Sequence, residues 1–207
     1  NTFLGLYTGR VNVPTPASGF GIGNTFVGRS AGYSNISGSN NTYMGYYSGL
    51  DATGTNNTYM GYLSGRYTSS GYSNTSLGSQ SLYANTTGCN NVAVGLSACN
   101  AIDGSGNTSI GAYANNYYGL GTNCTFVGYN SDAGANNLSN ATAIGYNAVV
   151  SASNSMVLGG TGGDAVNVGI GVTTPVEALY VVGRIKISQG SAPGTTTDKL
   201  YNISGAL

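Results

Sequence analysis

Side chains that could carry out chemistry are scarce in this sequence. Its 207 residues include 6 Lys or Arg, 6 Asp or Glu, and no His. Without His, an imidazole base and the usual His-containing zinc and iron sites are excluded. Asp51, Asp103 and Asp132 fall at different phases of the sequence repeat described below, so they do not form the close carboxylate pair that sugar hydrolysis uses. The sequence therefore predicts a protein that is not an enzyme, with no catalytic residue, metal or cofactor.

The charged residues also argue against two classes of partner. Basic and acidic residues balance, and the basic ones are scattered along the sequence: Arg10, Arg29, Arg66, Arg184, Lys186 and Lys199. Nucleic acids require clustered Lys and Arg to meet their phosphates. No apolar stretch approaches the roughly 20 residues needed to span a bilayer. We expect neither nucleic-acid binding nor membrane insertion by this segment.

Tyrosine is the residue type that most suggests binding. The candidate glycan contacts are Tyr43, Tyr46, Tyr47, Tyr59 and Tyr62, which fall at matching positions of two consecutive repeats. Stacked repeats would align these rings, and an aromatic face with a phenolic hydroxyl suits a carbohydrate surface. The alternative is that the rings pack on one another or against a neighbouring chain.

These side chains must be positioned by a repeat with the pattern Asn-Thr-x-aliphatic-Gly. Clear copies begin at Asn1, Asn24, Asn41, Asn57 and Asn74, and looser ones continue to Leu158-Gly159. From Gly28 onward, the closing glycines are separated by 17, 16, 17, 17, 16, 17, 17 and 14 residues. Such a period predicts an all-β fold, a parallel β-solenoid or β-roll with one repeat per turn.

Each repeat offers two strands too short to stand alone. The first strand is Thr-x-aliphatic, and it ends at a corner formed by Gly. A second segment follows and ends in a small residue, and a turn of Asn, Gly and Ser completes the repeat. Alternation places Thr and the aliphatic residue on one face and the variable residue on the other. A single turn buries too little to offset its ordering entropy, so the turns must stack.

Stacking would align the aliphatic residues as a core ladder along the axis. Its members are Leu4, Val27, Met44, Met60, Leu77, Val94, Ile110, Val127, Ile144 and Leu158. With neighbouring turns about 4.8 Å apart, ten turns predict a rod of roughly 45 to 50 Å. So thin a core leaves apolar surface to be covered, and self-association around an axis is the simplest cover.

The repeat, with a small residue three positions after its glycine, resembles two families of trimeric fibre. These are the β-roll heads of trimeric autotransporter adhesins and the coiled shafts of phage tail fibres. The stretch from Asn167 to Pro175, with Ala178 to Gly183, is similar to an element of tail fibres that end in a self-cleaving intramolecular chaperone. The stretch Thr195 to Asn202 is similar to the segment that often follows. The resemblance implies a homotrimeric fibre.

On this basis we expect two regions. Residues 1–160 form the repeat shaft, and residues 161–207 form a short β transition segment leading to a tip or chaperone domain outside this sequence. The odd number of cysteines, Cys89, Cys99 and Cys124, favours a phage fibre maturing in a reducing cytoplasm over an exported adhesin. A disulfide between Cys89 and Cys99 and glycosylation of Asn-x-Ser/Thr triplets stay open.

The expected function is that of a structural shaft segment which spaces or presents a receptor-binding tip for host attachment. Its partners would be further copies of the chain and a cell-surface glycan or protein receptor. Its location would be the virion tail fibre or the cell surface. The alternative is a surface-binding solenoid, ice-binding or glycan-binding, with a threonine row at Thr2, Thr25, Thr42, Thr58, Thr75 and Thr108. An ice-binding face is disfavoured because these threonines would lie beside the aliphatic core.

Overall fold

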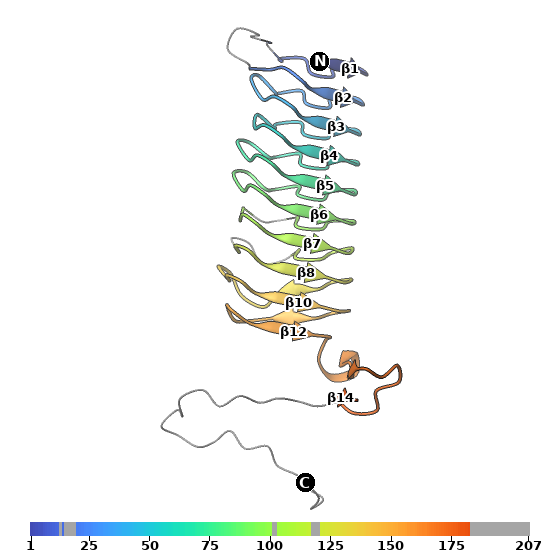
Figure 1. Cartoon of the computed structure of the whole chain (residues 1–207). Helices are drawn as coiled ribbons and strands as arrows, with labels where there is room; N and C mark the ends of the chain where they lie inside the picture. The colour runs from blue at the N-terminus through green and yellow to red at the C-terminus, as the bar shows by residue number, and fades with distance from the viewer. Residues whose placement is uncertain (13, 15–19, 101–102, 117–120, 183–207) are drawn as a thin grey trace, which may run out of the picture. The chain divides into compact units, whose positions relative to one another are not determined.

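The computed structural model describes residues 1–12, 14, 20–100, 103–116 and 121–182. It divides into two compact units, Asn1–Val166 and a unit that begins at Asn167. The first unit is a parallel β-solenoid in which successive turns stack along one axis (Figure 1). The predicted all-β, parallel-solenoid fold is therefore confirmed. The segment Thr195 to Asn202 lies outside the described residues.

One sheet of ten parallel strands runs the length of the solenoid, and each strand pairs with the strand of the next turn. The pairing is in register with the repeat, so that Thr42 lies opposite Thr58 and Met44 opposite Met60. The strands are β1 (Thr2–Leu4), β2 (Thr25–Val27), β3 (Thr42–Met44), β4 (Thr58–Met60), β5 (Thr75–Leu77), β6 (Val92–Val94), β7 (Thr108–Ile110), β8 (Thr125–Val127), β10 (Thr142–Ile144) and β12 (Met156–Leu158).

The remaining elements are small. Strands β9 (Asp132–Ala133) and β11 (Val149–Val150) form a second parallel pair, and η1 (Gly162–Asp164) is a short 3-10 helix. In the second unit, β13 (Val168–Ile170) pairs in parallel with β14 (Leu179–Val181).

The glycine after each strand forms the predicted corner. At Gly45, φ is 137°, and a Cβ would clash with the carbonyl oxygen of Gly61 in the next turn. Only glycine allows the turns to stack this closely. The second segment differs from the prediction: it is a strand only at β9 and β11 among the described turns. Elsewhere it is a tight turn, with left-handed backbone at positions such as Tyr47 (φ 57°) and Gly49 (φ 56°).

The inside of the coil is lined by the middle residue of each strand. This inward row comprises Phe3, Phe26, Tyr43, Tyr59, Ser76, Ala93, Ser109, Phe126, Ala143 and Val157, and its members from Phe26 to Ala143 are buried. The predicted alternation is correct, but the prediction that the aliphatic residues form the core of the coil is wrong. The small residues after each corner glycine and the Asn before each strand close over the middle residue, so its face becomes the interior.

In most turns, the size of the inward residue is complementary to the size of the residue six positions later: a large inward residue is paired with glycine, and a small one with a larger side chain. A Cβ on Gly49 would lie 2.6 Å from the Tyr43 ring, and Gly65 stands in the same relation to Tyr59. Where the inward residue is small, as at Ser76, the later position holds a larger side chain, Leu82. Protein interiors are close-packed, so the two positions share one volume. The turns of Phe126 and Ala143 depart from this rule: Asp132 stands at the later position of the first, and in the second Val149 is exposed while Val150 is buried.

Buried asparagines form a second ladder on the inside, which we call the asparagine ladder. Its buried members are Asn24, Asn41, Asn57, Asn74, Asn91 and Asn107. In each, the side-chain oxygen accepts from the backbone N–H one turn on, and the amide nitrogen donates to a glycine carbonyl; for Asn91 these partners are Asn107 (2.9 Å) and Gly104 (2.7 Å). The ladder thus pairs backbone groups that a thin coil buries away from water. The sequence pattern predicts turns at the asparagines and does not indicate this role.

Candidate functional site

The predicted core ladder lies on the outer surface of the sheet, and we call it the aliphatic row. Leu4, Met44, Leu77, Ile110, Ile144 and Leu158 are between 37 % and 66 % exposed, and Val27, Met60, Val94 and Val127 are half-buried. The threonine row shares this face, because it lies two residues before the aliphatic row. A single chain therefore presents a regular apolar row along its whole sheet.

Exposed aromatic and aliphatic side chains extend this surface past the corner glycine. The position after the glycine holds the exposed residues Leu6, Tyr46, Tyr62, Leu96, Tyr129 and Tyr146. The rings of Tyr46 and Tyr62 stack with centroids 5.7 Å apart, as do those of Tyr129 and Tyr146. Contiguous apolar surface of this kind marks an interaction site more often than isolated exposed residues do.

The five candidate glycan-contact tyrosines divide into two groups. Tyr43 and Tyr59 are fully buried in the inward row, with ring centroids 5.0 Å apart, so their assignment as glycan contacts is wrong. Burial raises the pKa of Tyr43 well above its ordinary value, and the charge of Tyr59 adds to this. Tyr46 and Tyr62 are exposed and Tyr47 is half-buried, so these three remain accessible to a partner.

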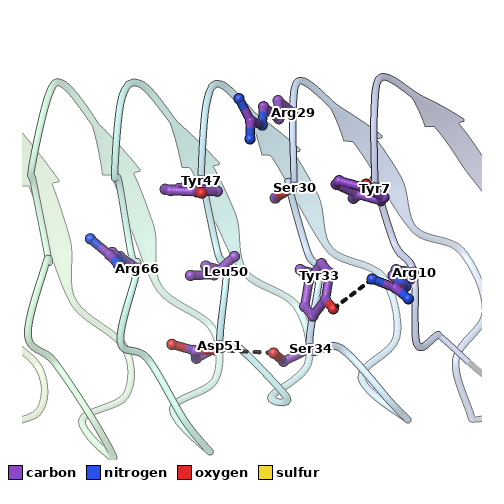
Figure 2. A pocket seen from close by; sticks show the side chains of 10 residues that line it. All are labelled: Tyr7, Arg10, Arg29, Ser30, Tyr33, Ser34, Tyr47, Leu50, Asp51 and Arg66. Atoms are coloured by element: carbon purple, nitrogen blue, oxygen red, sulfur yellow. Dashed lines mark hydrogen bonds between the residues drawn. The ribbon is translucent and has the colours of Figure 1, made fainter.

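A groove with a volume of about 410 Å³ lies over the first four turns, and we call it the arginine groove. Figure 2 shows three arginines around it: Arg10 and Arg66 towards its two ends and Arg29 at its upper edge. Tyr33, Tyr47 and Asp51 are among the residues between them. The basic residues, scattered in sequence, are thus gathered in space because stacking brings residues of successive turns together.

Aromatic rings hold the guanidinium groups in place. The Arg10 guanidinium lies 5.3 Å from the centre of the Tyr7 ring, and its Nη1 donates to the Tyr33 hydroxyl at 3.1 Å. The Arg66 guanidinium lies over the rings of Tyr47 (5.4 Å) and Tyr67 (4.8 Å). Cation–π contacts stabilise such groups without neutralising them, so the groove keeps its positive charge.

The acidic residues named in the sequence do not meet. Asp51 lines the arginine groove, where Ser34 Oγ donates to its Oδ1 at 3.0 Å. Asp103 is held in a turn by hydrogen bonds from Thr86, Thr87 and Gly88; partial burial raises its pKa, but these bonds outweigh burial and hold the pKa below its ordinary value. Asp132 is buried in β9. Among the described residues, no three His, Cys, Asp or Glu side chains gather as a metal site would require.

The three cysteines are free thiols. Cys99 is buried, and burial raises the pKa of its thiol to about 11. Cys124 occupies the position of the asparagine ladder after Asn107, whose side-chain oxygen accepts from its backbone N–H at 2.9 Å. Cys89 is half-buried and therefore the most accessible of the three.

Comparison with protein-family models, with curated proteins and with solved structures finds no match for this chain. In the part of the chain that the structure describes, no helix is long and apolar enough to cross a membrane.

Proposed function

We propose that this chain is a shaft segment of a homotrimeric fibre, of a phage tail or a bacterial surface, that spaces or presents a receptor-binding tip. The aliphatic row carries this proposal. Every strand of the ten-stranded sheet contributes one aliphatic side chain to the row, in register with its neighbours. Burying such a row contributes about 25 cal/mol per Å² of apolar surface removed from water.

The best occupant of this face is a second copy of the same chain. The aliphatic side chains recur once per turn, about 4.8 Å apart along the axis. A partner that meets all of them must repeat at the same distance, and another copy of this solenoid does so by construction. Assembly around a threefold axis closes the interfaces, as symmetric oligomers do, and leaves no copy with an uncovered row.

The interior suits a mechanical role. Backbone ladders connect every turn to the next, and the asparagine ladder adds a buried side-chain connection from Asn24 to Asn107. The aromatic stack of Phe26, Tyr43 and Tyr59, with centroids 4.7 and 5.0 Å apart, fills the first turns. Each turn contacts only its neighbours, so the rod transmits load along its axis without a central globular core.

The chain's own methionines test this proposal. Met44 and Met60 belong to the aliphatic row, and their thioethers react with peroxide when water reaches them. We expect both to be protected at micromolar protein concentration and to be oxidised faster on dilution, as peptide mass spectrometry would measure. Oxidation of both at the rate of free methionine at every concentration would contradict a shared seam.

A surface-binding solenoid remains the second candidate, because the structure removes the argument against it. Thr42, Thr58 and their counterparts lie on the outer face of the sheet, beside the aliphatic row and not beside the core. A flat row of threonines in register is the feature that an ice-binding face would need. A thermal hysteresis measurement separates the candidates: a freezing gap that Thr42→Lys abolishes favours ice binding, and no gap favours the shaft.

A further inference from the structure

The arginine groove is a second surface, distinct from the aliphatic row, and it has the composition of a ligand site. We infer that it binds an acidic carbohydrate, a chain of sugars that carry carboxylate groups. The inference does not rest on trimer formation, because the residues that line the groove belong to four successive turns of one chain.

The charge of the lining favours an anion. Arg10, Arg29 and Arg66 contribute three positive charges and Asp51 one negative charge, which leaves an excess of two in a chain whose net charge is zero. A planar guanidinium can donate two parallel hydrogen bonds to one carboxylate, which a lysine cannot do. Three such groups around one groove thus match several carboxylates, not one.

One hydroxyl donor in the groove is available to a ligand. The Tyr33 hydroxyl accepts from Arg10 at 3.1 Å, and a phenol that accepts in this way still has its own proton to donate.

The acidic side of the groove selects a sugar over a simpler anion. Asp51 would repel a phosphate or sulfate that has acceptors alone, since like charges in one groove are unfavourable. A sugar acid carries hydroxyl groups beside its carboxylate, and those hydroxyls can donate to Asp51 while the carboxylate meets an arginine. Ser34, which donates to Asp51 at 3.0 Å, and the rings of Tyr33 and Tyr47 complete a lining suited to a sugar's hydroxyl and C–H faces.

The groove is also elongated along the solenoid axis, as Figure 2 shows. Arg10 and Arg66 both stand five residues after a corner glycine, in turns three apart, so their backbones are separated by about 14 Å at the usual strand spacing. A single sugar cannot reach both arginines, whereas an oligosaccharide can. The ligand class is therefore an oligomer of sugar acids lying along the axis.

Calorimetric titration of the 207-residue chain with oligogalacturonate and with a polysialic acid oligomer, in low salt at neutral pH, tests the inference. We expect saturable binding of at least one of them, weakened as salt is added. Arg66→Gln and Arg10→Gln should each raise Kd by about tenfold, the usual effect of losing one charge-assisted hydrogen bond. The matched control is Ser70→Asp, which lowers the net charge equally but lies on an exposed turn outside the groove.

The controls decide between a sugar-acid site and a merely positive surface. Methyl-esterified oligogalacturonate, which has the same sugars without the charge, should not bind. If tripolyphosphate or a short single-stranded DNA binds as tightly as the sugar acids, or if Ser70→Asp weakens binding as much as Arg66→Gln, the assignment to a carbohydrate is wrong. The absence of binding by both oligosaccharides overturns it as well. Melting temperatures of the variants exclude unfolding as the cause of a loss, and Arg29→Gln offers a third, independent position.

Discussion

At the scale of single residues, the side chains of the asparagine ladder supply hydrogen bonds that backbone groups supply to one another in a wider sheet. The side-chain oxygen of Asn91 accepts from the backbone N–H of Asn107, and its amide nitrogen donates to the carbonyl of Gly104, so both backbone groups have a partner. Because buried polar groups without partners are costly, each ladder position is needed by the turn that follows it.

Replacing Asn91 by Ala should therefore destabilise the protein. Two buried backbone groups lose a partner, and each costs about 1 to 3 kcal/mol, so we expect a loss of about 3 kcal/mol in the free energy of unfolding. Denaturant titration followed by circular dichroism measures it. The neighbouring Asn90→Gly is the control: Asn90 is exposed with φ of 59°, and glycine accepts that conformation. Equal stability of the two variants would refute the ladder's role.

The buried thiol of Cys99 makes stability depend on alkaline pH. Its pKa is about 11 in the folded chain against an ordinary value of 9.0, so between these values the folded state binds more protons than the unfolded state. The contribution of this thiol to the free energy of unfolding is therefore complete below pH 9. It is lost as the pH rises to 11, by about 3 kcal/mol at most. The stability difference between the wild type and Cys99→Ala should follow this window; a difference that is flat from pH 8 to 11 would contradict it.

At the scale of elements, the repeat was predictable and its inside was not. Identical motifs such as Asn41 to Gly45 and Asn57 to Gly61 fixed the period, the register and the glycine corners. Alternation in a three-residue strand does not tell which face is buried, so the uniform aliphatic position predicts a core that the structure places on the outer face. The informative signal was the pairing of an aromatic residue with a glycine six positions later, as in Tyr59 and Gly65.

The groove was hidden for a related reason. Arg10 and Arg66 are 56 residues apart, but both stand five residues after a corner glycine, so superposing the repeats would have aligned them. Along the sequence, the basic residues are scattered. The tyrosine rings beside these arginines and the unpartnered Nε–H of Arg66 depend on side-chain positions that no repeat pattern specifies.

Because the inward residue and the residue six positions later share one volume, substitutions at the two positions of one turn should compensate for each other. Tyr59→Ser alone leaves a cavity, and Gly65→Leu alone places a side chain against the Tyr59 ring, so each should cost about 3 kcal/mol or more. The double variant recreates the Ser76 and Leu82 pair of the next turn. We expect it to be more stable than the sum of the two losses by about 2 kcal/mol in a double-mutant cycle. Strict additivity would contradict the shared volume.

At the scale of the whole molecule, the solenoid has two surfaces on opposite sides of its corner glycines. The aliphatic row precedes each glycine, and the groove residues Arg10 and Arg66 follow it. If the chain assembles through the aliphatic row as proposed, the groove would offer a binding position on the shaft.

The central claim, that the aliphatic row is a seam between copies, is tested most directly by light scattering on the chain and on Met60→Asp. At micromolar concentration the wild type should have the mass of three chains. Met60→Asp should have the mass of one chain with an unchanged β-type circular dichroism, because a charge cannot be buried in the seam but leaves the coil interior intact. Ser70→Asp, on an exposed turn, should remain a trimer. A folded wild type with the mass of a single chain, or a Met60→Asp variant that stays trimeric, would contradict the account.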